Sequence, residues 1–319
     1  MQKVKKILVV RLSSLGDVVL TFPFLNILKK KFPDSFVSYL TKPEYVSVVQ
    51  MNPNVNEIIP YSPKISIHNF DLIFDLQNNL KTNLLLNGKA GNILKYKKNN
   101  LKKFLLVNFK KNLINTVIPV YKKYIESLNN ISELSEDDYN FSVTNLLFIQ
   151  TNPLKEKFII VAPSAKHFTK RYPKEKFVDI LKPVSKSFRI VLTGSNSDTD
   201  KEICAYINSN IPECINTCGL LNFSELSTYI FNSEFVISND SGIMHLSEAM
   251  GKKVFVIFGS TVKEFGFFPQ LKNSFVSEVF DLDCRPCSHI GRSSCPKGHF
   301  NCMNLNPVFS NLNKFISQQ

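Results

Sequence analysis

The sequence predicts an α/β protein with two doubly wound domains. Short apolar, β-branched runs alternate with amphipathic stretches, which is typical of strand–helix repeats around a parallel sheet. The alternation stops at an acidic stretch near residues 133–138 and starts again at 158, after the turn signal Asn152-Pro153. A length of 319 residues suits two domains of ordinary size. We therefore expect an N-terminal domain over 1–152 and a C-terminal domain over 153–319.

The first half contains four runs that we predict to be strands, at residues 7–11, 36–41, 55–59 and 72–76. An amphipathic stretch over 18–31 follows the first strand and is predicted to be one helix. Pro33 and Asp34 would end that helix, since proline cannot continue it.

The second half repeats the pattern with more uniformly apolar runs, as expected of strands buried on both faces. We predict strands at 158–162, 189–193, 235–238 and 254–258, and helices at 174–185, 198–208, 224–232 and 242–250. Residues 311–317 form a last predicted helix, which could pack on either domain.

Composition excludes several classes of protein. With 44% hydrophobic and 20% charged residues, the chain is neither disordered, nor collagen, nor a coiled-coil rod. Seven cysteines are too few for a disulfide-built secreted scaffold. The first ten residues resemble the start of a signal peptide, but Arg11 and Asp17 interrupt the apolar stretch. We therefore expect a first strand there, and a cytoplasmic protein.

The net charge of +13 suggests an anionic partner: nucleic acid, a membrane surface or a phosphorylated substrate. Composition alone does not choose among them. Residues 81–125 contain eleven lysines and neither Asp nor Glu, with apolar residues between the lysines. This segment is either a solvated helical face or a surface for anionic lipid or phosphate.

A first candidate site lies directly after the first strand, in the run RLSSLGD over residues 11–17. Open α/β sheets bind ligands at the carboxyl ends of their strands. Gly16 would allow close approach to the backbone, and the Asp17 carboxylate would project into the crevice. The alternative is that Asp17 only caps the following helix. The sequence contains neither GxGxxG nor GxxxxGK[ST], which weakens a nicotinamide dehydrogenase or a P-loop enzyme.

A second candidate site is the run SNDSGIMH over residues 238–245, again between a strand and a helix. Asp240 and Ser241 can cap the helix, and Gly242 exposes backbone N–H groups. A helix N-terminus of this kind favours a phosphate or diphosphate. His245 would lie one turn further on, where a packed histidine is the plain alternative to a functional one.

Two further motifs carry polar or metal-binding residues. Ser164-Ala165-Lys166, followed by Lys170, comes after the first strand of the second domain, where a lysine could reach a diphosphate or simply be solvated. Cys284, Cys287, Cys295 and Cys302 fall within nineteen residues together with His289 and His299. They suggest a structural metal site, although reduced thiols in a packed loop are the alternative.

These motifs resemble glycosyltransferase family 9, the bacterial ADP-heptose:lipopolysaccharide heptosyltransferases. The resemblance rests on ILVVRLSSLGDV over 7–18, Thr21-x-Pro23, FPD over 32–34, SNDSGIMHL over 238–246 with Gly251, and FGST over 258–261. Cys295-Pro296 and Gly298-His299 are similar to the C-terminal segment of heptosyltransferase II-type members. The likeness extends over nearly the whole chain and is weakest at about 80–150.

The resemblance implies a GT-B fold, in which two Rossmann-like domains bind the acceptor and the nucleotide sugar on either side of a cleft. It also implies an inverting transfer that needs no metal and no cofactor. Asp17 would be the general base, beside Ser13, Ser14 and Gly16 on the acceptor side. An aspartate suits this role if burial raises its pKa, or if it accepts the proton late in the transition state.

On the donor side, the resemblance implies that Lys170 binds the diphosphate, Asp240 contacts the sugar, and Leu221 packs on the adenine. Ser241 and Gly242 would donate backbone N–H groups to the phosphates, with His245 beside them. Positive charge there would stabilise the ADP leaving group in place of a metal.

Two departures from the family pattern limit these expectations. Ser164-Ala165-Lys166 replaces a turn that is usually richer in Gly or Thr, and the lysine-rich 81–125 segment matches no family pattern. We expect an enzyme that moves heptose from ADP-heptose onto the inner core of a lipopolysaccharide precursor. Its partners would be a phosphorylated glycolipid and the surface of the inner membrane, and not nucleic acid. The alternatives are another nucleotide sugar, a basic nucleic-acid-binding protein, or an inactive scaffold.

Overall fold

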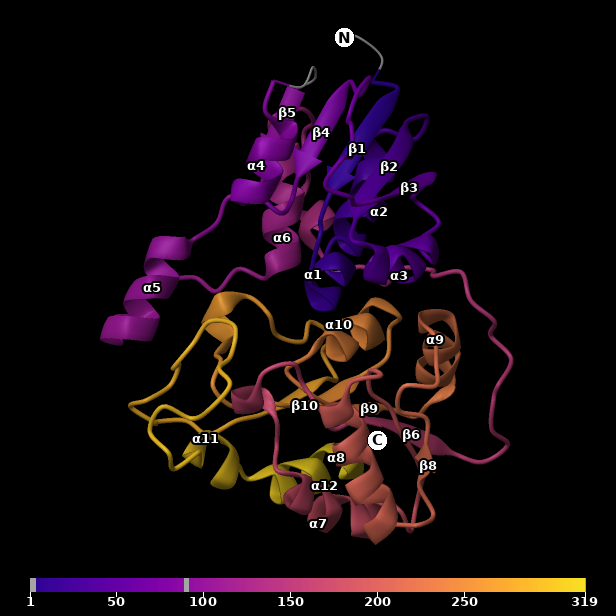
Figure 1. Cartoon of the computed structure of the whole chain (residues 1–319), viewed down its shortest axis with the longest axis vertical. Coiled ribbons are helices and arrows are strands. Elements are labelled where there is room, and N and C mark those ends of the chain that lie inside the picture. Colours follow the sequence, from indigo (N-terminus) through magenta and orange to yellow (C-terminus); the bar gives the residue numbers. More distant parts are fainter. Residues whose placement is uncertain (1–3, 89–91, 319) are drawn as a thin grey trace. The chain divides into compact units, whose positions relative to one another are not determined.

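The computed structural model describes residues 4–88 and 92–318, and the chain divides into two compact units (Figure 1). The first unit comprises Met1–Lys98 and Ile118–Phe148, and the second comprises Asn99–Val117 and Ile149–Gln319. A sequence boundary at residue 152 places 99–117 in the first domain, whereas the contacts group this segment with the second unit. No helix in the described ranges combines the length and apolarity needed to cross a bilayer.

The first unit is built on a five-stranded parallel sheet with the strand order β3-β2-β1-β4-β5. Its strands are β1 (Lys6–Val10), β2 (Phe36–Thr41), β3 (Glu57–Pro60), β4 (Leu72–Asp75) and β5 (Asn92–Lys95). β1 is central and apolar because it is covered on both faces; Ile7, Leu8, Val9 and Val10 are fully buried. The four predicted strands are present, and β5 was not predicted.

The helices of this unit include the predicted stretch 18–31, which forms two helices rather than one. Pro23 lies in the first turn of the second of these helices, where its missing N–H costs nothing, but it cannot continue the first. The helices are α1 (Leu15–Val19), α2 (Phe22–Lys31), α3 (Val46–Gln50), α4 (Leu80–Leu86) and α6 (Val120–Ile125).

The second unit has a six-stranded parallel sheet with the order β11-β10-β9-β6-β7-β8, which confirms the predicted α/β class. The strands are β6 (Phe158–Ala162), β7 (Arg189–Leu192), β8 (Ile215–Asn216), β9 (Val236–Asn239), β10 (Val254–Ile257) and β11 (Phe275–Ser277). The helices are α5 (Asn100–Phe109), α7 (Lys174–Val184), α8 (Asp198–Asn210), α9 (Phe223–Asn232), α10 (Gly242–Ala249), α11 (Asn301–Asn304) and α12 (Val308–Ser317).

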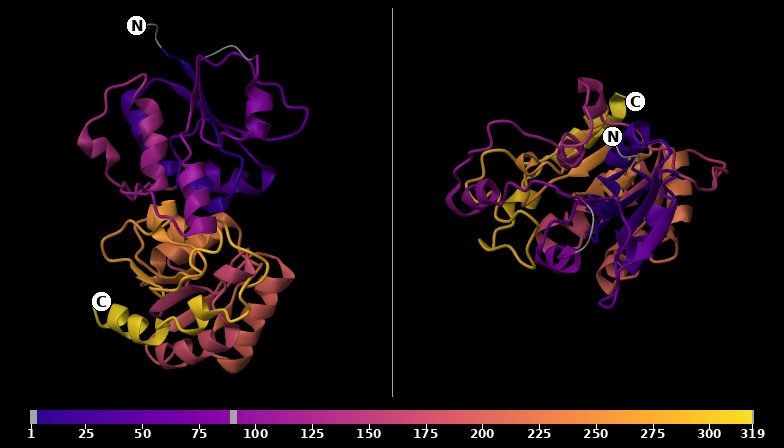
Figure 2. Two further views of the ribbon diagram at one scale, coloured as in Figure 1. Left: turned by 90° about the vertical axis from the view of Figure 1, so that its left-hand side faces the viewer. Right: turned by 90° about the horizontal axis from the view of Figure 1, so that it is seen from above.

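The C-terminal helix α12 packs within the second unit, where Figure 2 shows it in yellow. It contacts α7, β10 and β11. The ring of Phe315 lies 5.2 Å from that of Phe235 and 5.6 Å from that of Phe255, centroid to centroid. These aromatic contacts tie the end of the chain to the apolar core of the second unit.

Strand order determines where each unit can form a crevice. In the first unit the chain leaves β1 toward β2 and returns to β4 on the other side; in the second it leaves β6 toward β7 and returns to β9. Ligand sites of open α/β sheets lie outside the carboxyl ends of strands at this reversal. The reversal points are therefore the ends of β1 and β4, and the ends of β6 and β9.

A buried carboxylate connects α10 to the segment that leads into β11. Glu248 is 1% exposed and accepts hydrogen bonds from the backbone N–H groups of Gln270 (2.6 Å) and Leu271 (2.9 Å) and from Ser274 Oγ (2.8 Å). Burial raises the pKa of Glu248 to about 7, although these three hydrogen bonds act in the opposite direction. The proton is therefore held more tightly in the folded protein than in the unfolded chain.

We predict that this group makes the protein less stable as the pH rises. Its contribution is fully present below its ordinary pKa of 4.5 and is lost as the pH passes through about 7. The loss is on the order of 3 kcal/mol. Urea unfolding of the wild type and of Glu248→Gln, measured from weakly acid to weakly alkaline pH, checks this. The variant should lose most of the pH dependence; an equally steep dependence in both proteins contradicts the prediction.

Candidate active site

Asp17 lies at the reversal point of the first sheet and is held by two neighbours. Its Oδ1 forms an ion pair with the Arg11 guanidinium at 2.5 Å. Its Oδ2 accepts hydrogen bonds from the backbone N–H of Ser14 at 3.1 Å and from Ser14 Oγ at 2.9 Å. Asp17 therefore caps the start of α1, which was the alternative to a functional role. It also forms an ion pair with Arg11, which a helix cap does not require.

The ion pair determines the charge state of Asp17. Burial alone would raise the pKa of this carboxyl, but Arg11 and the hydrogen bonds from Ser14 outweigh it and hold the pKa below its ordinary value. Of the two conditions under which an aspartate suits the role of general base, a raised pKa is therefore not met, which leaves late acceptance of the proton. The lowered pKa makes Asp17 an ionised carboxylate. Because 18% of its side-chain surface is accessible, a ligand can still reach it.

Arg11 also joins the ends of the two strands that flank the reversal point. One guanidinium nitrogen donates to Asp17, and another donates to the Leu76 carbonyl after β4 at 2.6 Å. Gln77 strengthens this link, because its Oε1 accepts from the N–H groups of Leu12 (3.1 Å) and Ser13 (3.4 Å). The predicted site residues Ser13, Ser14 and Asp17 are thus brought together, with Gly16 buried beside them in α1.

Arg11 was not assigned a role from the sequence, and its aromatic surroundings could not be predicted. Its guanidinium carbon lies 5.7 Å from the centre of the buried Tyr124 ring. Within the described ranges, Arg11 Nε and the Tyr124 hydroxyl are buried without a hydrogen-bond partner. Burial raises the pKa of Tyr124 well above its ordinary value, so this phenol stays neutral.

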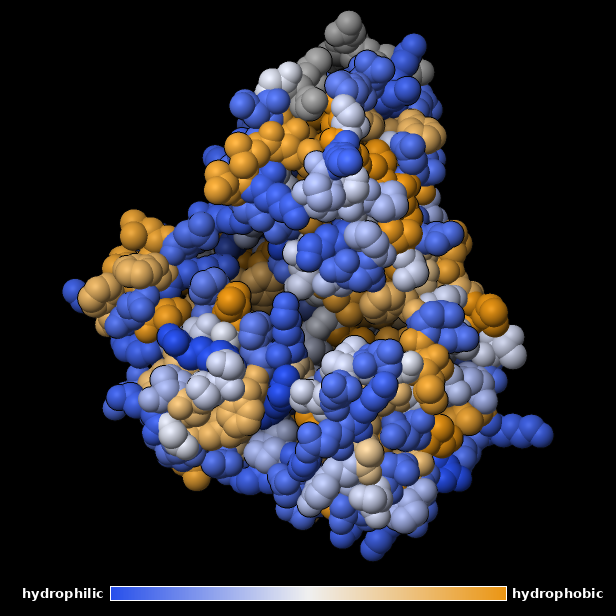
Figure 3. Space-filling model, in the orientation of Figure 1, coloured by the Kyte–Doolittle hydropathy of each residue, from blue (hydrophilic) through white to orange (hydrophobic). Residues whose placement is uncertain are grey.

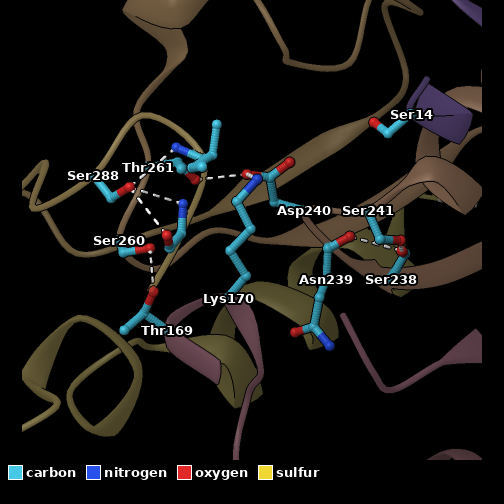
Figure 4. Close-up of polar contacts among 12 residues, drawn as sticks. Ser14, Thr169, Lys170, Ser238, Asn239, Asp240, Ser241, Ser260, Thr261 and Ser288 are labelled. Atoms are coloured by element: carbon cyan, nitrogen blue, oxygen red, sulfur yellow. Dashed lines mark hydrogen bonds and ion pairs between the residues drawn. The ribbon is translucent and has the colours of Figure 1, made fainter. Parts of the chain in front are cut away.

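In the second unit, Lys170 and Asp240 meet at the reversal point. Lys170 Nζ lies 2.7 Å from Asp240 Oδ2, and the same oxygen accepts a hydrogen bond from Thr261 Oγ1 at 2.6 Å (Figure 4). Lys170 ends a short 3₁₀ turn (Phe168–Lys170), Asp240 follows β9, and Thr261 follows β10. Both side chains of the pair are largely buried, and the ammonium group retains donors for a further acceptor.

Asn239 fixes the position of these segments. Its side-chain nitrogen donates to the Pro163 carbonyl after β6 at 2.8 Å, and its oxygen accepts from the N–H of Tyr172 at 3.1 Å. A close crossing lies nearby: a Cβ on Gly259 would come within 2.8 Å of the Thr169 carbonyl oxygen, so only glycine fits there. These contacts hold the Lys170 turn against the ends of β6, β9 and β10.

The N-terminus of α10 follows Asp240 directly. Ser241 precedes the helix, but its hydroxyl bonds with Ser238 Oγ at 3.0 Å rather than capping α10 (Figure 4). The first-turn N–H groups of a helix have no partner within it, and the helix dipole makes this end attractive to anions. His245 is buried in the helix, with its ring 6.2 Å from that of Phe267.

His167 and His289 are affected by the positive charges around the Lys170 turn. Burial lowers the pKa of His167, and Lys170, Lys166 and Arg171 lower it further. Burial also lowers the pKa of His289, with further lowering by Lys103 and Lys170. Both imidazoles are therefore uncharged at neutral pH, and the lysines supply the positive charge. An electropositive turn beside a helix N-terminus is suited to a diphosphate.

Three other predicted features have a different environment. Leu221 lies in the loop between β8 and α9 and is partly buried. Ser164 Oγ donates to Asp200 at 2.6 Å, so its hydroxyl is already engaged. Lys166 is exposed, which agrees with the solvated interpretation.

The four C-terminal cysteines are free thiols. Cys302 is buried in the core of the second unit, whereas Cys284, Cys287 and Cys295 are partly exposed in the preceding loop. Across residues 4–88 and 92–318, no three His, Cys, Asp or Glu side chains are arranged to hold a metal ion.

We predict that Arg11→Met raises the pKa of Asp17 and lowers the free energy of unfolding by about 3–5 kcal/mol, because a largely buried carboxylate loses its counter-charge. Carboxyl-carbon NMR titration and urea unfolding measure the two effects. Lys42→Met is the control in the same unit, since the Lys42–Glu44 pair is exposed and should cost less than about 1 kcal/mol. An unchanged pKa of Asp17 in Arg11→Met would contradict the assignment.

Comparison with known proteins identifies the family of this chain. Residues 63–296, more than half of the chain, match glycosyltransferase family 9 (heptosyltransferase). Lipopolysaccharide heptosyltransferase 1 of Campylobacter coli is 22% identical, covering 86% of this chain and 87% of that protein. Lipooligosaccharide heptosyltransferase 2 of Campylobacter jejuni is 26% identical, covering 91% and 90%.

Solved structures show the same fold. A family 9 glycosyltransferase from Veillonella parvula superposes with a TM-score of 0.75 at 18% identity, covering 99% of this chain and 98% of that one. Escherichia coli heptosyltransferase WaaC with ADP gives a TM-score of 0.71 at 16% identity, covering 98% and 99%. The iron-containing dodecameric glycosyltransferase TibC of Escherichia coli gives 0.64 at 12% identity, covering 100% and 76%. The two parallel sheets thus form a GT-B fold, and the chain belongs to glycosyltransferase family 9.

Proposed function

We propose that the protein transfers heptose from ADP-heptose to the inner core of a lipopolysaccharide precursor, with inversion at the anomeric carbon. The observation that supports this most directly is the Lys170–Asp240–Thr261 cluster at the N-terminus of α10. It provides a cation, backbone donors and a carboxylate side by side, which are the groups that a sugar diphosphate needs. The names of the relatives, which are heptosyltransferases, support heptose as the sugar.

In the proposed reaction, the acceptor hydroxyl attacks the anomeric carbon of the donor while the bond from that carbon to the β-phosphate oxygen breaks. ADP leaves with both electrons of this bond, and the hydroxyl proton passes to the Asp17 carboxylate. A carboxylate with a lowered pKa is a weak base toward a free hydroxyl. It therefore accepts the proton late, when the attacking oxygen is already bonded to carbon and has become acidic.

The donor half of the reaction is assigned to the second unit. Lys170 would share its ammonium hydrogens between Asp240 and the diphosphate, and the N–H groups at Ser241 and Gly242 would bind the phosphate oxygens. Asp240 would contact a sugar hydroxyl, while His245 and Leu221 would lie beside the phosphates and the adenine. These groups stabilise the negative charge that develops on ADP, so the transfer we propose uses no metal ion and no organic cofactor.

The acceptor we propose is a phosphorylated glycolipid reached at the surface of the inner membrane. Supporting this, residues 81–125 carry eleven lysines without an acidic residue. The structure divides this segment, since 99–117 groups with the second unit and Lys123 is buried in the first. A nucleic-acid partner is the less favoured alternative, because the lysines match no known nucleic-acid-binding signature.

We predict that Asp17→Asn binds ADP as the wild type does but transfers heptose at least a hundredfold more slowly, since the amide cannot accept the proton. Mass spectrometry of the lipid product measures the transfer, and thermal shift with ADP verifies that the donor site is intact. Glu44→Gln, an exposed carboxylate of the same unit, is the matched control and should remain active. Wild-type turnover by Asp17→Asn would eliminate Asp17 as the base.

We predict that Lys170→Met weakens ADP binding by about tenfold to a hundredfold, because one charge-assisted contact to the diphosphate is lost. Isothermal titration in the presence of EDTA measures the affinity without a metal bridge. Lys166→Met, an exposed lysine on the same loop, should have a much smaller effect. Equal losses in both variants would point to a diffuse charge effect, and ADP binding or transfer that requires added magnesium would contradict the metal-free donor site.

A different nucleotide sugar is the main alternative within the same fold. The loop after β6 supports this alternative. Ser164 there donates its hydroxyl hydrogen to Asp200 and so does not donate it to a phosphate. Thermal shift with a panel of nucleotide sugars separates the candidates, since the true donor stabilises the fold by mass action.

A further inference from the structure

Helix α5 carries an unusual number of apolar side chains on its solvent face. Leu101, Phe104 and Phe109 are 71%, 54% and 60% exposed, and Leu113 just beyond the helix is 48% exposed. At 100° per residue, positions 101, 104 and 109 fall on one face of the helix. Figure 3 shows the apolar surface over α5 in orange, bordered by hydrophilic side chains in blue.

The opposite side of α5 is fixed to the second unit, so this exposure does not come from an unanchored helix. Leu106 is buried, and Lys103 Nζ lies 5.9 Å and 5.4 Å from the ring centres of Phe265 and Phe267. After the helix, Lys110 Nζ donates to the carbonyls of Cys284 (3.2 Å) and Pro286 (2.6 Å). The cysteine-containing loop therefore supports α5 from behind and presents its apolar face outward.

The charges next to this face are positive. Lys102 and Lys111 are exposed, and Asn99–Val117 contains no Asp or Glu. Burial lowers the pKa of Lys110, and Arg292 and Lys297 of the supporting loop lower it further, which places two more cations near the end of the helix. A short helix with exposed Leu and Phe side chains between lysines is the pattern of a segment that lies in the interface of an anionic bilayer.

We propose that α5 and the residues that follow it, Asn100–Leu113, dock the enzyme on a membrane that contains anionic phospholipid. Leu101, Phe104, Phe109 and Leu113 would enter the boundary between headgroups and acyl chains, and Lys102 and Lys111 would bind lipid phosphates. This proposal deepens the proposed function, since a lipid-linked acceptor is reached at such a surface. It adds apolar insertion to the electrostatic attraction that the lysine count suggests.

Charge complementarity favours a bilayer over the other partners that could cover this face. A second copy of the chain would bring lysines against lysines with no acidic residue of the segment to offset them. A nucleic acid would satisfy the lysines but would leave the aliphatic side chains of Leu101 and Leu113 exposed to water. An anionic bilayer satisfies both the charged and the apolar residues of the segment.

The full chain offers a direct probe, because it contains no tryptophan. Phe104→Trp introduces a single fluorophore on the apolar face of α5, and Phe309→Trp places one on an exposed position of α12 as the control. We expect vesicles of phosphatidylcholine with phosphatidylglycerol to shift the emission of Phe104→Trp to shorter wavelength. Brominated acyl chains should quench it. Vesicles of phosphatidylcholine alone should have little effect, and Phe309→Trp should not respond to either.

A matched pair of triple variants tests the apolar contribution by vesicle co-sedimentation. Replacing Leu101, Phe104 and Phe109 by Gln should weaken binding to anionic vesicles by about tenfold or more. Replacing Phe280, Leu305 and Phe309 by Gln, which are equally exposed elsewhere in the unit, should not. Vesicle binding by the wild type should also fall with added salt, because lysines contribute to it.

The outcomes separate this proposal from the proposed function. Loss of vesicle binding in the α5 variant, with unchanged heptose transfer to a detergent-solubilised acceptor, supports docking. Equal vesicle binding by both triple variants overturns it, as does a wild type that does not bind anionic vesicles. A change from dimer to monomer in the α5 variant without a change in vesicle binding would identify a second copy as the occupant. Vesicle binding without any transferase activity would leave docking intact and contradict the transferase assignment.

Discussion

The order of parallel strands determines where polar side chains can gather in this protein. Each sheet begins with a central strand from which the chain winds first to one side and then to the other. At that reversal, two strand ends have no crossover connection between them, so loops from both can converge. Arg11 and Asp17 with the loop after β4, and Lys170 with Asp240, occupy these two places.

Both reversal points hold a largely buried ion pair, and the two pairs differ in what else their charged groups bind. In the first, Arg11 is committed to Asp17 and to the Leu76 carbonyl, so the pair mainly fixes the position and charge of the carboxylate. In the second, the Lys170 ammonium has donors to spare, and Thr261 shares in holding Asp240. Buried pairs of this kind gain little for stability over apolar packing, which is consistent with a role in function.

Much of this arrangement was predictable from the sequence because it is local. Strands followed by Gly- and Asp-containing turns predict Asp17 and Asp240 at the carboxyl ends of their strands. The parts that were not predicted depend on distant contacts or on a single backbone feature. Pro23 divides the predicted helix over 18–31, and the hydrogen bond from Arg11 to the Leu76 carbonyl joins residues far apart in the sequence.

The structure of the lysine-rich segment 81–125 could also be predicted only in part from the sequence. Its charge was evident from composition, but its division between the two units was not. Lys123 is buried, Lys103 lies over two aromatic rings, and Lys110 binds backbone carbonyls of the cysteine-containing loop. Those contacts join residues about 170 positions apart, such as Lys110 and Cys284, and only the folded chain brings them together.

We propose that the first unit deprotonates a lipid-linked acceptor and that the second unit delivers heptose from ADP-heptose. The most direct measurement incubates the purified protein with ADP-heptose and a lipid A-based precursor and analyses the lipid by mass spectrometry and NMR. We expect the lipid to gain one heptose residue, joined with the anomeric configuration opposite to that of the donor. A product formed with another nucleotide sugar but not with ADP-heptose, or a product that retains the donor configuration, would contradict it.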